Sequence, residues 1–152
     1  MVNKWDKRFL ELARLASTWS KDPSTGVGAV IVDKRNRIRG IGFNGLPQGI
    51  ADDPEILMDR DIKLRLVLHA EENAIDFSTG DLTGCTLYVW PLPPCAHCAA
   101  KIAQHDIARV VSSGIQLHRW GEDNALANRI FNQKGITHDT FGEEIFDVSH
   151  CS

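Results

Sequence analysis

The sequence predicts an α/β fold, a single domain of three layers in which helices cover both faces of a mixed or largely parallel sheet. After an opening hairpin, stretches rich in β-branched residues alternate with segments whose apolar residues recur every three to four positions. The chain has 152 residues, the size of one domain, without internal repeats or a linker rich in Gly, Ser or Pro. We therefore treat residues 1–152 as one domain and expect about the last 12 residues to form a mobile tail.

The first half of the chain predicts a helix followed by a hairpin. Apolar residues from Trp5 to Trp19 form one helical face, and turn-forming residues at 20–26 end the helix. A buried strand is expected at 27–33, and a second strand at 38–43 returns after the basic turn 34–37. We expect this basic tip to be solvated, with nucleic-acid binding as the weaker alternative.

The second half predicts helices alternating with strands. Leu64, Val67 and Leu68 have helical spacing, and the helix that contains them is expected to break near His69. Three prolines just beyond position 90 prevent the strand before them from continuing. The expected elements are a helix at about 60–77, a strand at 86–90, a helix at 95–105, a strand at 109–112 and a helix at 123–132.

The composition excludes several classes of protein. Hydrophobic residues make up 43% of the chain and charged residues 24%, as in ordinary folded domains. Seventeen Lys and Arg against twenty Asp and Glu leave a net charge of −3, the wrong sign for broad binding to nucleic-acid phosphates. No stretch is long and apolar enough to span a bilayer, and because charged residues fill the N-terminal segment we expect no secretory signal. We expect a cytoplasmic protein that acts on a small molecule.

Three residues have the types and spacing of zinc ligands. Cys95 and Cys98 form a C-x-x-C pair, and His69 precedes them by 26 positions. Neither Cys85 nor Cys151 is a convincing fourth ligand, because one precedes a strand and the other lies in the expected tail. Zinc bound by three residues keeps an open position for water, as catalytic sites do. We therefore predict one catalytic Zn²⁺ per chain.

Glu71 is the candidate catalytic residue. Its spacing of two from His69 does not place both side chains on one helical face, so we interpret it as a proton carrier rather than a ligand. A redox dithiol at Cys95 and Cys98, or a zinc module without catalysis, stays open as an alternative. The other five histidines are expected to be surface or supporting residues, namely His97, His105, His118, His138 and His150.

H-x-E followed by P-C-x-x-C is the signature of zinc nucleobase deaminases. On this basis the chain resembles the zinc-dependent cytidine and deoxycytidylate deaminase superfamily, and within it the deoxycytidylate (dCMP) deaminases. The resemblance covers most of the chain. It is carried by residues 20–30, the G-F-N-G-x-P-x-G loop at 42–49, the H-A-E-x-N-A-I segment at 69–75 and residues 131–136.

The resemblance implies a cytidine-deaminase-like αβα fold with a five-stranded sheet, hydrolysis of dCMP to dUMP and ammonia, and a homohexamer. It also implies activation by dCTP with Mg²⁺ and inhibition by dTTP. The candidate substrate-binding residues are Asn44, Ala70, Lys21, Ser24 and Thr25, the last three for the phosphate. The candidate effector contacts are Gly45, Asp52 and Asp53.

Two features leave the substrate open. The segment between Gly49 and His69 is shorter than in some members of the family, and His118 stands where a tyrosine is frequent. Asn44 has a second interpretation as a turn-former before Gly45. The alternative substrates are CMP, a 5-substituted dCMP and adenosine in tRNA, the last disfavoured by the acidic balance of the chain.

Overall fold

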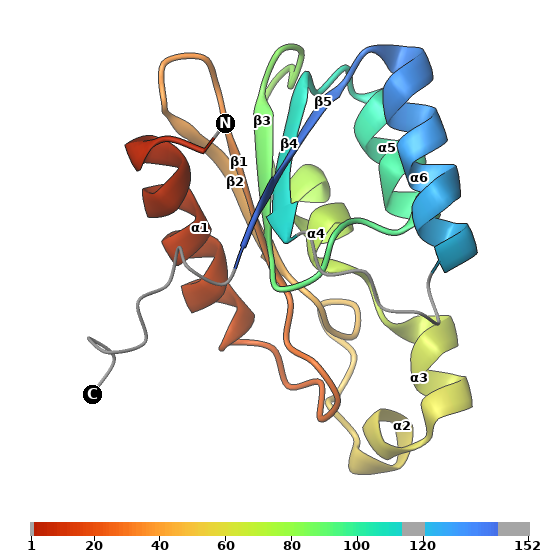
Figure 1. Ribbon diagram of the computed structural model, residues 1–152. Helices are drawn as coiled ribbons and strands as arrows, with labels where there is room; N and C mark the ends of the chain where they lie inside the picture. The colour runs from red at the N-terminus through yellow and green to blue at the C-terminus, as the bar shows by residue number, and fades with distance from the viewer. Residues whose placement is uncertain (1, 114–120, 143–152) are drawn as a thin grey trace.

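The computed structural model describes residues 2–113 and 121–142. Its centre is a five-stranded sheet with strand order β2-β1-β3-β4-β5, flanked by helices (Figure 1). The elements in chain order are α1 (Lys4–Ser17), β1 (Gly28–Val32), β2 (Ile38–Phe43), α2 (Pro54–Met58), α3 (Arg60–Leu66), α4 (Ala70–Asp76), β3 (Thr86–Trp90), α5 (Ala96–Gln104), β4 (Arg109–Ser113), α6 (Gly121–Lys134) and β5 (Thr137–Phe141). The expected mobile tail falls almost entirely outside the described residues, as do His118, His150 and Cys151.

The sheet is mixed, as predicted. β1 pairs antiparallel with both β2 and β3, whereas the β3–β4 and β4–β5 pairs are parallel. All five residues of β1 are buried, which agrees with its continuous apolar sequence and its place between two strands. β5 lies at one edge, and its polar sequence THDTF is only partly buried.

Helices cover both faces of the sheet, so the predicted three-layer arrangement is confirmed. α1 packs on one face, where Leu10 and Ala13 meet Val30 and Tyr88. α4, α5 and α6 cover the other face (Figure 1). The larger apolar core lies on this second side, and the metal-ligand motifs are at the starts of two of its helices.

Close packing against β2 fixes the position of α4. A Cβ atom on Gly42 would lie 2.3 Å from the backbone nitrogen of Ala74 and 2.4 Å from the carbonyl oxygen of Ala70. Only glycine permits this approach of a helix backbone to a strand. Asn73 adds a hydrogen bond of 2.8 Å from its side-chain amide to the carbonyl oxygen of Phe43.

A buried ionic network joins α1 to the sheet. Asp6 is 1% exposed and accepts hydrogen bonds of 2.8 and 2.9 Å from the Arg109 guanidinium and of 2.7 Å from the Tyr88 hydroxyl. Arg109 also donates to Asp139 on β5. Burial alone would raise the pKa of Asp6, but hydrogen bonds from Arg109, the Asn3 backbone and Tyr88 outweigh it and hold the pKa below its ordinary value.

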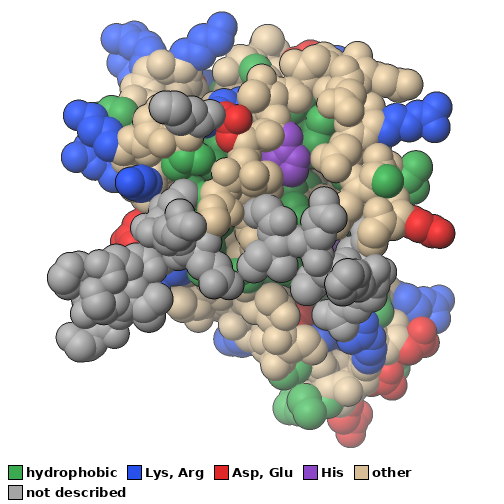
Figure 2. Space-filling model, viewed as in Figure 1, with side chains coloured by type: hydrophobic (Ala, Val, Ile, Leu, Met, Phe, Trp, Pro, Cys, Tyr) green, Lys and Arg blue, Asp and Glu red, His purple; other side chains and the backbone are tan. Residues whose placement is uncertain are grey.

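Charge is unevenly distributed over the surface. Figure 2 shows basic side chains at the top of the molecule, over the β1–β2 turn and the start of α1, and acidic side chains together with basic ones at its lower end, over α2 and α3. The basic turn is exposed, as expected for a solvated tip. Across residues 2–113 and 121–142, none of the helices is both long and apolar enough to cross a membrane. Cytoplasmic location stays a prediction.

Candidate metal centre and active site

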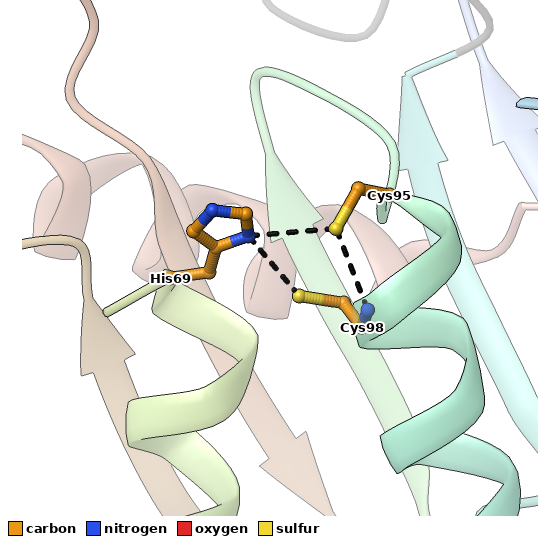
Figure 3. A group of neighbouring side chains, drawn as sticks. All are labelled: His69, Cys95 and Cys98. Carbon is orange, nitrogen blue, oxygen red and sulfur yellow. Dashed lines mark hydrogen bonds between the residues drawn. The ribbon is translucent and has the colours of Figure 1, made fainter. Parts of the chain in front are cut away.

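His69, Cys95 and Cys98 come together between the starts of α4 and α5 (Figure 3). The Nδ1 atom of His69 lies 3.3 Å from the sulfur of Cys98 and 3.5 Å from the sulfur of Cys95. The three potential ligand atoms all lie within 4.8 Å of one another. His69 and the cysteine pair, 26 and 29 positions away in the sequence, therefore form one cluster with the predicted composition.

Local structure places each of these ligands. His69 is the N-cap of α4, and its backbone N–H donates to the Glu72 carboxylate at 3.1 Å. Cys95 is the N-cap of α5, immediately after two prolines, and its sulfur accepts from the backbone N–H of Cys98 at 3.4 Å. The predicted helix starts are thus confirmed. Both ligand groups lie at positive ends of helix dipoles, which favour thiolates.

The chemistry of these donors fits zinc. Hydrogen bonding from Cys98 lowers the pKa of the Cys95 thiol to about 4. Hydrogen bonding to Cys95 raises the pKa of the His69 imidazole to about 9, while the same sulfur and burial hold the pKa of Cys98 far above its ordinary value. These shifts favour a Cys95 thiolate beside a protonated His69 imidazole and a protonated Cys98 thiol. A divalent cation bound here would displace the protons of His69 and Cys98. Two sulfurs and one imidazole nitrogen are typical zinc ligands.

Glu71 lies beside this cluster without belonging to it. The group of potential metal ligands found in the described part of the chain contains His69, Cys95 and Cys98 but not Glu71. The Glu71 side chain is buried, with 4% of the residue exposed, and burial raises its pKa to about 7. Glu71 lines the same cavity as His69 and Cys95. A carboxyl group at this position can hold a proton next to a substrate.

The cavity has a volume of about 200 Å³ and collects most of the predicted substrate residues. Ser24 and Thr25 come from the loop before β1, Asn44 from the end of β2 and Ala70 from α4. Apolar side chains of α3 and of the loop before α5 complete its lining, namely Leu64, Val67, Leu92 and Pro93. A cavity bordered by potential metal ligands, a buried carboxyl group and hydroxyl side chains can bind and hydrolyse a small polar molecule.

Asn44 has a structural role in addition to its place in the lining. Its Oδ1 accepts from the backbone N–H of Val27 at 2.8 Å, and its Nδ2 donates to the carbonyl oxygen of Thr25 at 2.9 Å. With 7% of the residue exposed, Asn44 fastens the loop before β1. The predicted contact with a sugar or effector stays a prediction.

The other predicted residues lie outside the cavity lining. Lys21 is exposed and pairs with Asp52 at 2.8 Å, while Asp53 caps α2 by accepting from the Glu55 backbone. Gly45 forms an isolated β-bridge with Leu68. The functions assigned to Lys21, Gly45, Asp52 and Asp53 also stay predictions.

Five polar residues of the lining were not predicted from the sequence, namely Asp22, Arg60, Lys63, Asp123 and Asn124. The carboxylate of Asp123 accepts from the backbone N–H of Ala96 at 2.9 Å, at the first residue of α5. Arg60 and Lys63 belong to α3, where the only signal was two cations three positions apart, and that spacing is common on solvated helices.

Comparison with known proteins gives a family match. Residues 3–113 match the family model described as "Cytidine and deoxycytidylate deaminase zinc-binding region". An uncharacterized deaminase from the luxG 3′ region of Aliivibrio fischeri is 48% identical over 139 residues, covering 90% of this chain and 92% of that protein. The deoxycytidylate deaminase of Homo sapiens is 40% identical over 147 residues, covering 91% of this chain and 80% of that protein.

Solved structures show the same fold. The dCMP deaminase of cyanophage S-TIM5 in its apo form superposes with a TM-score of 0.73, covering 93% of this chain and 100% of that chain at 24% identity. The predicted cytidine-deaminase-like fold is therefore confirmed.

Proposed function

Since the chain belongs to the cytidine and deoxycytidylate deaminase family, we propose that it is a zinc-dependent hydrolase that converts dCMP to dUMP and ammonia. The observation that carries the proposal is the geometry at one cavity, where buried Glu71 borders the same space as the His69–Cys95–Cys98 cluster. The choice of dCMP is supported by 40% identity over most of the chain with a protein named deoxycytidylate deaminase.

In this proposal His69, Cys95 and Cys98 would hold Zn²⁺, which would act as a Lewis acid and lower the pKa of a water molecule toward neutrality. A carboxylate oxygen of Glu71 accepts a proton from the water that adds to C4 of cytosine. Glu71 then delivers a proton to N3 of the base. Glu71 next takes the second proton from the hydroxyl group now on C4 and passes it to the amino nitrogen, so that the C4–N4 bond breaks, ammonia departs and C4 keeps the oxygen as a carbonyl.

Replacing the proton carrier tests this mechanism without removing the metal. Glu71→Gln keeps the shape of the side chain but cannot take up a proton, so it should retain zinc and lose roughly 100- to 10,000-fold or more in kcat for dCMP. Cys95→Ser should lose zinc as well, because it removes a ligand. Zinc content and the ultraviolet change on loss of the amine are the measurements. Near-normal turnover by Glu71→Gln would contradict the mechanism.

A panel of substrates separates the alternatives. Turnover of dCMP should exceed that of CMP, 5-methyl-dCMP and a tRNA with adenosine at its wobble position. Fast turnover of one of the other substrates with slow turnover of dCMP would show that the protein is a deaminase with a different substrate. Zinc binding without any turnover would favour a non-catalytic module.

Regulation and assembly complete the proposal. Its regulatory part is activation by dCTP with Mg²⁺ and inhibition by dTTP, supported by the family resemblance and tested by adding each to the dCMP assay. A homo-oligomer, with a hexamer favoured, is supported by apolar side chains exposed on α2 and α3, such as Met58 at 74% and Leu64 at 59%. Light scattering gives the mass of the assembly.

A further inference from the structure

Asp123, the third residue of α6, bonds to the start of a different helix. Its Oδ2 atom accepts a hydrogen bond of 2.9 Å from the backbone N–H of Ala96, the first residue of α5. The N–H groups at a helix start have no partner within their own helix, and a carboxylate suits them because it also faces the positive end of the helix dipole. The two residues are 27 positions apart in the sequence, so this contact joins α6 to a helix that carries metal ligands.

The peptide group between Cys95 and Ala96 is bonded on both sides. Its N–H donates to Asp123, and its carbonyl oxygen accepts from the backbone N–H of Ala99 at 2.8 Å. The plane of this peptide sets the ψ angle of Cys95, which is 171° and therefore extended rather than helical. Because ψ determines how the side chain of Cys95 is directed relative to α5, a fixed peptide also fixes the direction of the sulfur.

The direction of this sulfur decides whether the three potential metal ligands can act together. The sulfur of Cys95 lies 3.5 Å from Nδ1 of His69 and accepts from the backbone N–H of Cys98 at 3.4 Å. His69 is the N-cap of another helix, so its distance from the sulfur depends on how the chain enters α5. Removing a group that supports a metal ligand without touching the metal typically lowers metal affinity by about 10- to 100-fold.

Packing in the core places Asp123 at this point. Asp123, Ala127 and Phe131 are spaced four apart and so lie on one face of α6. Ala127 and Phe131 are buried in the same apolar cluster as Ile102 of α5, which holds the two helices together. Glu122 belongs to the same first turn of α6 but is exposed and lies outside the cavity lining. Of these two neighbouring carboxylates, Asp123 is the one that lines the cavity and bonds to α5.

Building on the proposed zinc site, we propose that Asp123 is a positioning residue for the metal ligand Cys95, and that α6 is thereby part of the support of the metal centre. By fixing the peptide after Cys95, the carboxylate holds the sulfur in the direction in which it can share a cation with His69 and Cys98. Asp123 lies outside the group of potential metal ligands found among the described residues, so it acts through Cys95 rather than as a ligand.

Zinc affinity, measured by competition with a chelator, tests this contact without relying on turnover. Asp123→Ala removes the acceptor and should raise the zinc dissociation constant by about 10- to 100-fold. Asp123→Asn keeps an oxygen acceptor in a side chain of similar shape, so its zinc dissociation constant should rise less than that of Asp123→Ala. Glu122→Ala removes the exposed carboxylate of the same helical turn, and this matched control should bind zinc like the wild type.

Cobalt provides a second readout, which a loss of stability alone would not change. The absorption spectrum of bound Co²⁺ depends on its thiolate ligands and their geometry. At saturating Co²⁺ we expect a weaker thiolate-to-cobalt band in Asp123→Ala and a wild-type spectrum in Glu122→Ala.

Three results would overturn the inference. They are an unchanged zinc affinity or cobalt spectrum in Asp123→Ala, a loss of affinity in Asp123→Asn as large as in Asp123→Ala, and an equal loss in Glu122→Ala. A lower stability of Asp123→Ala to urea with wild-type zinc affinity falls under the first of these and would assign Asp123 a purely structural role. Failure of the wild-type protein to bind zinc would instead refute the proposed function itself, before any variant is compared.

Discussion

Gly42→Ala should displace α4 and with it the candidate catalytic residue Glu71, although Gly42 itself does not line the cavity. Gly42 lies on β2, and the added methyl carbon would stand 2.3 Å from the Ala74 nitrogen and 2.4 Å from the Ala70 oxygen. Ordinary contacts of this kind begin at 3.4 Å, so α4 has to move by about 1 Å. That helix begins next to His69 and contains Glu71.

The size of the effect follows from this displacement. A misplacement of about 1 Å in a catalytic group can reduce the rate by roughly 100-fold. Overpacking also costs about 1 to 3 kcal/mol of unfolding free energy. We therefore expect Gly42→Ala to lose about 100-fold in kcat/KM for dCMP and to bind zinc more weakly, as measured by competition with a chelator. The zinc measurement remains informative even if the substrate differs from dCMP.

Two glycine variants serve as controls. Gly121→Ala, at the first position of α6, adds a methyl group that meets nothing within 4 Å and should change neither stability nor activity by much. Gly28→Ala would place its methyl carbon 2.0 Å from the Ala13 oxygen in α1, on the opposite face of the sheet, and should lower stability without weakening zinc binding. Normal zinc affinity and activity in Gly42→Ala would refute the reasoning that contact with β2 positions α4.

The buried network around Asp6 gives two further predictions. Arg109→Met leaves the Asp6 carboxylate buried without its cation and should cost about 3 to 5 kcal/mol of unfolding free energy at pH 7. Lys134→Met, which removes a surface ion pair, should cost less than about 1 kcal/mol. A loss below about 1 kcal/mol for Arg109→Met in urea unfolding would show that the network contributes little. Because the folded-state pKa of Asp6 is lowered, the stability it contributes to the wild type is present above the unfolded pKa of about 3.9 and is lost as the pH falls through the folded value. Unfolding curves from pH 7 to 3 should therefore show the wild type losing stability below about pH 4 while its advantage over Arg109→Met shrinks, and a constant advantage would contradict the linkage.

Local patterns predicted most of the fold. β2 and β3 have the boundaries expected from their β-branched runs, and the helical segment before position 77 is broken at His69 as expected. Two elements were missed. α2 contains five residues with none buried, so it leaves no apolar periodicity, although Asp53 followed by Pro54 is a helix-start signal. β5 has a polar sequence, and only its pairing with β4 makes it a strand.

The residues of the candidate site also differ in how far the local sequence predicts them. The metal ligands and Glu71 were predictable because each occupies a helix start that a few neighbouring residues specify, such as Glu72 after His69. The burial of Lys63 was not predictable, because its partner Asp22 is 41 positions away in the sequence. Leu64, one of the residues whose spacing predicted this helix, lines the cavity and is 59% exposed, so the spacing indicated the helix but not which of its residues is buried.

This contrast separates residues that local motifs position from residues that long-range contacts position. His69 and Cys95 are helix N-caps and Glu71 follows His69 by two positions, whereas the burial of Lys63 depends on Asp22 in a distant loop. A shift of one position in α3 rotates its side chains by about 100°, which would turn Lys63 away from Asp22. A one-residue insertion between Lys63 and His69 should therefore lower stability to urea without loss of zinc, and loss of zinc would show that α3 also positions the candidate metal ligands.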